Sequence, residues 1–248
     1  MVFTAVQKKP GDIMISFIIP AYNEEGVIQS TIVAVMKVGR AIGGSFEVLV
    51  VDDNSSDQTG KIAEQCGARV VHVTHRQIAA TRNTGAKEAK GDLFVFVDAD
   101  TLVNEAVVRD AVEAIRGGAI GGGCLFKFDG KVPWLARLTV SLTMLVGRWK
   151  TLCGGCFMFV TRKAFEELGG FDEKMYAGEE LGLCQGLKRL GPFVLLKRYV
   201  TTSGRKVRTY SSLELMWFVI RLLFKGTGMV ADRRGLDFWY GTRREDLG

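Results

Sequence analysis

Short apolar runs alternate with segments of helical spacing over the first hundred residues, and this alternation constrains the fold most. The runs at 15–19, 46–51, 69–73 and 93–97 are rich in valine, isoleucine, leucine and phenylalanine. Runs of this length and composition indicate buried β-strands. Because helical segments separate them, the pattern predicts βαβ units and a mostly parallel sheet that is covered on both faces.

The second half of the chain is less regular. A helix is expected near 105–115, a strand near 119–128, a strand at 156–160 and a helix near 179–190. No linker of distinct composition separates the halves. We therefore expect a single compact α/β domain that is followed by a C-terminal extension.

Polar residues follow three of the four strands. The first strand leads into Tyr22, Asn23 and Glu24, the second into Asp52-Asp53, and the fourth into Asp98-Ala99-Asp100. Ligands of open α/β sheets bind outside the carboxyl ends of the strands. Several carboxylates that meet at one edge repel each other without a cation, so this edge is the candidate site.

Asp98 and Asp100 are the strongest metal candidates by pattern. If the strand geometry continues through them, both side chains point to one side and suit Mg²⁺ or Mn²⁺, which bridges to phosphates. The alternative is that both belong to a turn that caps the next helix. Asn23 is likewise expected to cap a helix whose first turn carries two acids, Glu24 and Glu25.

These motifs occur in a characteristic order. The series resembles the inverting glycosyltransferases of family 2, which have the GT-A fold, and the resemblance covers roughly residues 14–190. Its segments are Pro20–Glu25, Val50–Thr59, Arg82–Ala86, Asp98–Asp100, Gly169–Glu173 and Gly178–Glu180.

The resemblance implies a domain plan. A single GT-A-type domain, with a Rossmann-like, mostly parallel sheet flanked by helices, is expected over residues 1–210. Its nucleotide-binding half would cover about 14–101 and its acceptor-side half about 102–210. A basic helical extension would follow over 211–248.

The resemblance also implies roles for residues at the donor site. Asp53 would hydrogen-bond the base, Arg82 would lie near the base or the diphosphate, and Asp98 would contact the ribose or assist the metal. Asp100 would ligate the cation, which would be Mn²⁺ or Mg²⁺. The full nucleotide-binding set is Pro20, Tyr22, Glu24, Asp53, Arg82 and Asp98.

The catalytic base is expected from the acid pair Glu179-Glu180. The family usually has Glu-Asp here and uses the second acid to deprotonate the acceptor, so the resemblance assigns the role to Glu180, with Glu179 as the other candidate. The alternative is structural, because both acids open a helix and favour its N-terminus electrostatically.

Basic residues are concentrated at the C-terminal end. The formal charge is +6, with 33 Lys and Arg against 27 Asp and Glu. Residues 188–248 hold 13 basic and 5 acidic residues, a net of +8, so residues 1–187 carry −2. Some family members have a similar basic run after the last strand, so the resemblance implies that Arg205 and Lys206 contact phosphate or the acceptor. The alternative is a solvated basic loop.

The apolar stretches at 135–146 and 213–224 are shorter than the roughly 18 residues that a membrane-spanning helix needs. The second stretch suits either a helix that covers the core or an interfacial anchor. Five cysteines and the absence of an apolar leader favour a reducing, cytoplasmic setting, with the inner face of the membrane as a candidate surface.

The predicted activity is metal-dependent, inverting transfer of a sugar from a nucleotide sugar, foremost a UDP-sugar, to a hydroxyl. The acceptor would be lipid-linked or a cell-envelope glycan. Two alternatives stay open: a nucleotidyltransferase and a non-catalytic nucleotide- or glycan-binding module. The sequence has no G-x-G-x-x-G run, P-loop or nucleic-acid recognition motif, and the single Cys153-x-x-Cys156 is weak support for zinc or redox chemistry.

Overall fold

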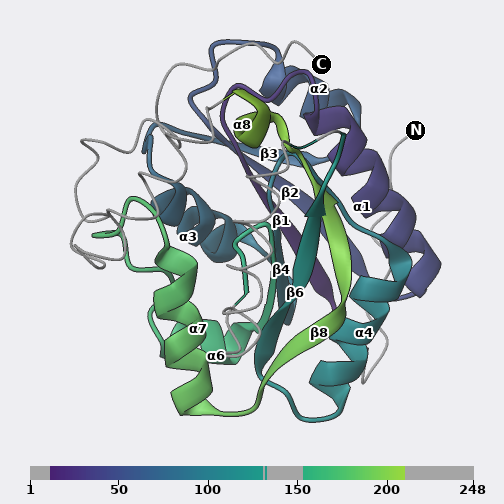
Figure 1. Cartoon of the computed structure of the whole chain (residues 1–248), viewed down its shortest axis with the longest axis vertical. Helices are drawn as coiled ribbons and strands as arrows, with labels where there is room; N and C mark the ends of the chain where they lie inside the picture. The colour runs from purple at the N-terminus through teal and green to yellow at the C-terminus, as the bar shows by residue number, and fades with distance from the viewer. Residues whose placement is uncertain (1–11, 131, 133–152, 210–248) are drawn as a thin grey trace.

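The computed structural model describes residues 12–130, 132 and 153–209. Figure 1 shows these residues in colour and the rest as a thin grey trace. The two apolar stretches at 135–146 and 213–224, and the whole extension over 211–248, lie outside the described residues. The domain boundary expected at residue 210 therefore stays a prediction.

Over the first hundred residues, strands and helices alternate as the apolar pattern predicts. The strands are β1 (Ile15–Ala21), β2 (Phe46–Asp53), β3 (Arg69–Val73), β4 (Leu93–Val97), β5 (Thr101–Leu102), β6 (Gly121–Phe128), β7 (Phe157–Thr161) and β8 (Phe193–Thr202). The helices are α1 (Ile28–Ile42), α2 (Thr59–Gln65), α3 (Ile78–Glu88), α4 (Glu105–Arg116), α6 (Arg162–Glu167), α7 (Glu179–Leu190) and α8 (Arg205–Thr209).

The strands form one sheet in the order β3-β2-β1-β4-β7-β6-β8-β5. The first four are parallel to one another, β7 is antiparallel to both of its neighbours, and β6 pairs with β8 in parallel. The mostly parallel α/β sheet is thus confirmed. The two-residue strand β5, which pairs antiparallel with β8, was not predicted because it is too short to carry an apolar pattern.

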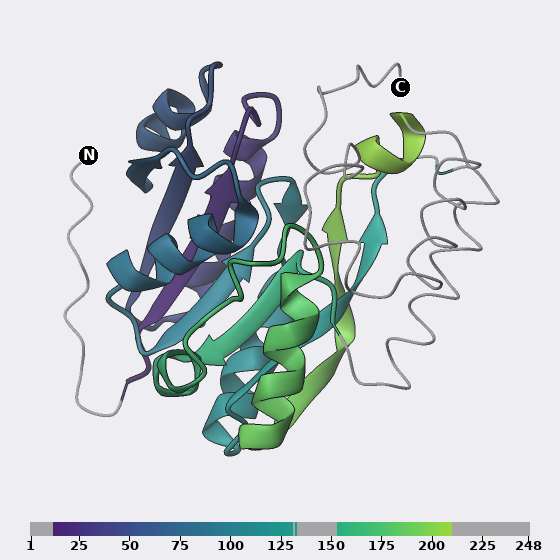
Figure 2. The ribbon, with the colours of Figure 1, turned by 90° about the vertical axis from the view of Figure 1, so that its left-hand side faces the viewer.

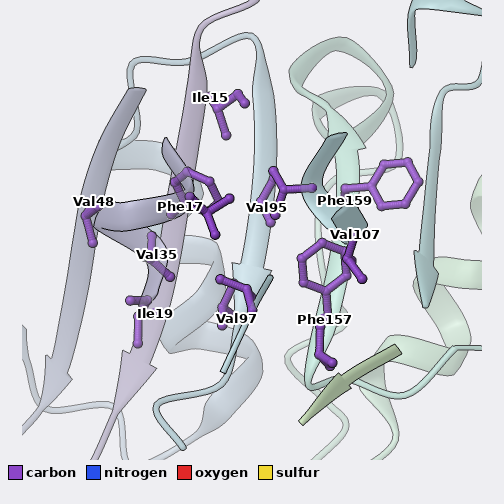
Figure 3. Close-up of a cluster of buried hydrophobic side chains, with 14 of the residues drawn as sticks. Ile15, Phe17, Ile19, Val35, Val48, Val95, Val97, Val107, Phe157 and Phe159 are labelled. Atoms are coloured by element: carbon purple, nitrogen blue, oxygen red, sulfur yellow. The ribbon is translucent and has the colours of Figure 1, made fainter. Parts of the chain in front are cut away.

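Helices cover both faces of the sheet (Figures 1 and 2). One cluster of buried residues joins the sheet to α1, α2 and α4, and a second joins it to α3, α6 and α7. Phe17, Val95 and Phe157 belong to the first cluster (Figure 3), whereas their strand neighbours Ile18 and Phe96 belong to the second. Side chains alternate along a strand, and both sets are apolar, so β1 and β4 are buried on both sides.

The helix expected to begin at Asn23 begins later. Asn23 has a positive φ of 51°, and its side-chain oxygen accepts a hydrogen bond from the backbone N–H of Ser56 at 2.8 Å. The first helical residue is Ile28, and Val27 precedes it without a side-chain cap. The prediction was wrong because a contact from another loop holds the Asn23 side chain.

The strand geometry does not continue through Asp98 and Asp100. Strand β4 ends at Val97, and the carbonyl of Asp98 accepts a hydrogen bond from the Thr101 N–H at 3.0 Å. The two aspartates therefore lie in a turn. Neither caps α4, because Asn104 accepts from the N–H of Val107 at 3.0 Å at the start of that helix.

Candidate active site

The candidate site lies at the carboxyl ends of the parallel strands. Ala21 at the end of β1 pairs in register with Asp52 of β2, so Tyr22 and Asp53 follow at neighbouring positions. Pro20 is buried within β1 opposite Val51. The fold thus brings the first two predicted motifs together, as the parallel pattern requires.

Asp53 is a structural anchor for the segment that precedes α3. One carboxylate oxygen accepts a hydrogen bond from the backbone N–H of Arg76 at 2.7 Å. The other accepts from the N–H of Gln77 at 3.1 Å and from the Thr81 hydroxyl at 2.9 Å. A carboxylate has about four acceptor positions. The base contact expected at Asp53 stays a prediction. The three hydrogen bonds leave about one acceptor position of the carboxylate for a nucleobase.

Arg82 lies at the centre of a buried ion-pair cluster. Its side chain is 2% exposed and donates to the carboxylate of Glu179, to Asp98 at 2.7 Å and to the carbonyl of Gly155 at 3.0 Å. Burial by itself would lower the pKa of this guanidinium, but Asp98, Glu179 and Glu180 raise it above its ordinary value. Arg82 is therefore charged and joins the turn after β4 to the start of α7.

Asp98 and Asp100 are the candidate ligands for a cation. Asp98 shares its carboxylate with Arg82, and one oxygen of Asp100 accepts from the Thr202 hydroxyl at 3.3 Å. Within the described residues, no group of three acidic, histidine or cysteine side chains is placed to hold a metal. Mg²⁺ sites commonly use one or two carboxylates and complete their shell with substrate phosphates and water, so two aspartates fit such a cation.

Glu179 and Glu180 are adjacent in sequence but have different surroundings. Glu179 is 4% exposed and is bound by Arg82. Glu180 is half-buried, and burial together with the charge of Glu179 raises its pKa from the ordinary 4.5 to about 8. A neutral carboxyl that can lose its proton near pH 8 suits proton transfer. The two acids thus have different surroundings, which their positions in the sequence did not show.

The raised pKa of Glu180 predicts a pH-dependent stability. Because the folded state holds this proton up to about pH 8 and the unfolded state loses it near pH 4.5, the stabilisation is complete below 4.5 and is lost as the pH rises through 8. Glu180→Gln removes the effect. In urea unfolding with EDTA, the free energy of unfolding of the variant should rise relative to that of wild type. The rise should be up to about 1.4 kcal/mol per pH unit between pH 5 and 8.

The control for this measurement is Glu166→Gln, which changes an exposed carboxyl of α6 in the same way. Its unfolding free energy should follow the pH dependence of wild type. A constant difference between Glu180→Gln and wild type across the range would contradict the proton that we place on Glu180.

Gly155 lies beside Arg82 and the Glu180 carboxyl. A Cβ at this position would lie 3.1 Å from Nη2 of Arg82 and 3.5 Å from the carboxyl carbon of Glu180. The sequence marked this residue only as part of the Cys153-x-x-Cys156 segment. Here Cys153 and Cys156 are free and buried, and the sulfur of Cys153 lies 3.2 Å from that of Cys184 on α7. These thiols pack the segment against α7.

Arg205 reaches the site from the other end of the chain. Its guanidinium donates to Glu24 at 2.8 Å, and both side chains are largely buried. The backbone N–H of Glu24 donates to the Thr59 hydroxyl at 2.8 Å. The structure therefore places Arg205 at the edge where phosphates are expected. Lys206 follows Arg205 in the helix α8, and its side chain lies outside the described part.

Arg76 also lies at this edge of the sheet, and it was not predicted from the sequence. Its guanidinium carbon lies 3.7 Å from the centroid of the Tyr22 ring. No local sequence pattern predicts this contact, because the two residues are far apart in the chain. They meet only when β1, β2 and β3 are paired.

The comparison with known families agrees with the fold. The family model described as glycosyl transferase family 2 matches residues 16–169, which is more than half of the chain. The chain belongs to this family, and the GT-A fold expected from the motif order is confirmed.

Curated relatives are similar over part of their length. Dolichol-phosphate mannosyltransferase of Pyrococcus furiosus is 31% identical over 144 residues, which cover 54% of this chain and 40% of that protein. The UDP-Glc:alpha-D-GlcNAc-diphosphoundecaprenol beta-1,3-glucosyltransferase of Escherichia coli is 37% identical over 95 residues, or 37% of this chain and 36% of that one. The chain thus spans less than half of either relative.

Solved structures share the fold. A mannosyltransferase from Pyrobaculum calidifontis, in complex with GDP-Man and Mn²⁺, has a TM-score of 0.66 at 17% identity and covers 91% of this chain and 65% of that one. Glucosyl-3-phosphoglycerate synthase from Mycobacterium tuberculosis, in complex with Mn²⁺, UDP and glucosyl-3-phosphoglycerate, has a TM-score of 0.61 at 23% identity. The match covers 88% of this chain and 81% of that one.

Among the residues that the structure describes, no helix is long and apolar enough to cross a membrane.

Proposed function

We propose that this protein is a metal-dependent, inverting glycosyltransferase that moves a sugar from a nucleotide sugar, foremost a UDP-sugar, to a hydroxyl acceptor. The observation that carries the proposal is the cluster around Arg82. It holds Asp98, beside the candidate metal ligand Asp100, and Glu179, beside the candidate base Glu180, at the carboxyl edge of one sheet. Family membership supports the same activity.

Each residue of the candidate site would have a separate role in such a reaction. Asp100 and Asp98 would hold Mn²⁺ or Mg²⁺, which, when bound, offsets the charge that grows on the leaving diphosphate. Arg205, now paired with Glu24, would add a positive charge at the same edge. Glu180 would accept the proton of the attacking hydroxyl. Pro20, Tyr22 and Asp53 would bind the nucleoside.

The roles of Arg82 and Glu179 follow from their pairing. Since Arg82 is 2% exposed and occupied by two carboxylates, we propose that it positions Asp98 and Glu179 rather than binding the base or the diphosphate directly. Glu179 then fixes the start of α7, which sets the place of Glu180.

Product analysis tests the reaction class. The proposed enzyme releases a nucleoside diphosphate and a product of inverted anomeric configuration from a panel of UDP-, GDP- and dTDP-sugars. Release of pyrophosphate would instead identify a nucleotidyltransferase. Donor binding without turnover across an acceptor panel would identify a binding module.

The metal role can be tested at Asp100. Asp100→Asn keeps an acceptor for the Thr202 hydroxyl but removes the charge. We expect Mn²⁺ binding, measured by electron paramagnetic resonance, to weaken and donor turnover to fall by about 10²-fold or more. EDTA should abolish wild-type turnover.

Asp110→Asn is the matched control, since this aspartate lies on α4 and pairs with Arg198 at 2.9 Å. It should bind Mn²⁺ and turn over like wild type. Turnover that survives both EDTA and Asp100→Asn would remove the metal from the proposal.

The acceptor is proposed more broadly. The names of two relatives include dolichol phosphate and a diphosphoundecaprenol-linked sugar. We propose a lipid-linked or cell-envelope glycan acceptor, with the enzyme in the cytoplasm and at the inner face of the membrane. Binding to anionic liposomes, and its loss when the C-terminal basic residues are reversed in charge, tests the membrane contact.

A further inference from the structure

Arg76 and Tyr22 form a flat stack at the edge of the sheet where the nucleoside is expected. Tyr22 follows β1, and Arg76 lies in the segment between β3 and α3. The guanidinium carbon is 3.7 Å from the ring centroid, and both side chains are half-buried. This is within the distance at which a guanidinium is attracted to an aromatic face, so the Tyr22 ring orients the guanidinium plane.

The backbone of Arg76 is held in an uncommon conformation. Its φ is 52°, in the left-handed region that favours glycine. The hydrogen bond from its N–H to Asp53, at 2.7 Å, and the adjacent bond from Gln77 hold this turn. A glycine would adopt the same turn without strain, yet the chain has a long planar cation here. Backbone strain that the surroundings maintain points to a function for the side chain.

We propose that Arg76 is a nucleobase-binding residue: the base of the sugar nucleotide stacks on the face of the guanidinium that Tyr22 leaves open. The inference rests on the proposed function, which places a nucleotide sugar at this edge. Guanidinium planes are established stacking surfaces for bases. Asp53, which fixes the backbone of Arg76, ties the platform to the carboxyl end of β2.

A stacking role differs from a phosphate-binding role in its chemistry. Stacking needs the planar guanidinium, which lysine lacks, whereas a phosphate contact needs mainly the charge. Stacking also requires a base, so pyrophosphate would gain nothing from Arg76. These differences give the proposal measurable consequences.

The test measures the dissociation constants of UDP, GDP and pyrophosphate by calorimetry in the presence of Mn²⁺. We use Arg76→Gly, Arg76→Lys and wild type. Both variants should bind the preferred nucleoside diphosphate about 10-fold more weakly, with pyrophosphate affinity unchanged. Arg76→Gly should be at least as stable as wild type, because glycine relieves the positive φ, so a loss of affinity there is not a loss of folding.

Two further variants sharpen the result. Arg109→Ala removes an exposed arginine of α4 that pairs with Glu105 and should leave every affinity unchanged. Tyr22→Leu removes the platform beneath the guanidinium. Its effect and that of Arg76→Gly should be less than additive in the double variant, because the two side chains act as one stack.

Each outcome has a definite meaning. Unchanged or tighter nucleotide binding in Arg76→Gly overturns the inference, because the guanidinium would then make no favourable contact with the base or would block its site. Equal weakening of nucleotide and pyrophosphate, with rescue by lysine, also overturns it in favour of a phosphate contact. If wild type binds neither UDP nor GDP, the nucleotide-sugar function fails and the inference fails with it.

Discussion

Replacing Glu180 with glutamine is expected to lower the rate of sugar transfer by about 10²–10⁴-fold, the usual contribution of a general base. Glutamine keeps the size and shape of the side chain but cannot accept the acceptor's proton. Because the loss concerns the chemical step, kcat should fall while the donor affinity stays near that of wild type.

The pH dependence adds a second readout. Since the pKa of Glu180 is raised to about 8 in the free enzyme, kcat/KM of wild type should rise with pH and level off above that value. The residual kcat/KM of Glu180→Gln should lack this rise with pH. Steady-state kinetics between pH 6 and 9.5 measure both effects.

Glu179→Gln is the informative comparison, because it changes the neighbouring acid that Arg82 binds. It should lower the thermal stability as well as the rate, whereas Glu180→Gln should remain folded by circular dichroism. Full transfer by Glu180→Gln would remove this residue from the mechanism and make Glu179 the next candidate base.

The largest effect on stability is expected at Arg82. Replacing it with methionine fills much of the volume but leaves Glu179, 4% exposed, without its cation. Breaking a buried ion pair from one side costs about 3–5 kcal/mol. Urea denaturation should therefore show a midpoint far below that of wild type, and donor turnover should be lost with the placement of Asp98 and Glu180.

The double variant Arg82→Met/Glu179→Met separates charge burial from packing. If the uncompensated carboxylate causes the instability, removing it as well should restore much of the lost free energy of unfolding. Arg109→Ala breaks an exposed pair with Glu105 and should cost less than about 1 kcal/mol. A double variant as unstable as the single one would mean that Arg82 acts by packing, beside the Phe171 ring at 5.4 Å.

The helices and strands were predictable where the pattern is local. The helical segment expected between the runs at 69–73 and 93–97 is found over Ile78–Glu88, and the helix expected near 105–115 is found over Glu105–Arg116. The start of α1 was not predictable. Asn23 has the composition of a helix cap, but its side chain and backbone bind Ser56 and Ser55, more than thirty residues away.

The candidate site was predictable as a set of positions but not as a set of contacts. The ends of β1, β2 and β4 had to meet, because parallel strands present their carboxyl ends at one edge. The sequence could not show that Asp53 binds the backbone of Arg76, or that Arg205 crosses to Glu24 over 181 positions. Such partners are set by the packing of whole elements.

By itself, the sequence determined the α/β class, the strand-end acids and the family, because apolar period and motif order are properties of short segments. Only the tertiary structure decided which of the two acids, Glu179 or Glu180, is held in an ion pair. That choice depends on Arg82 of α3, 97 positions away from Glu179. Its buried guanidinium draws the Glu179 carboxylate into an ion pair. Burial and the charge of that neighbour then leave Glu180 with its raised pKa.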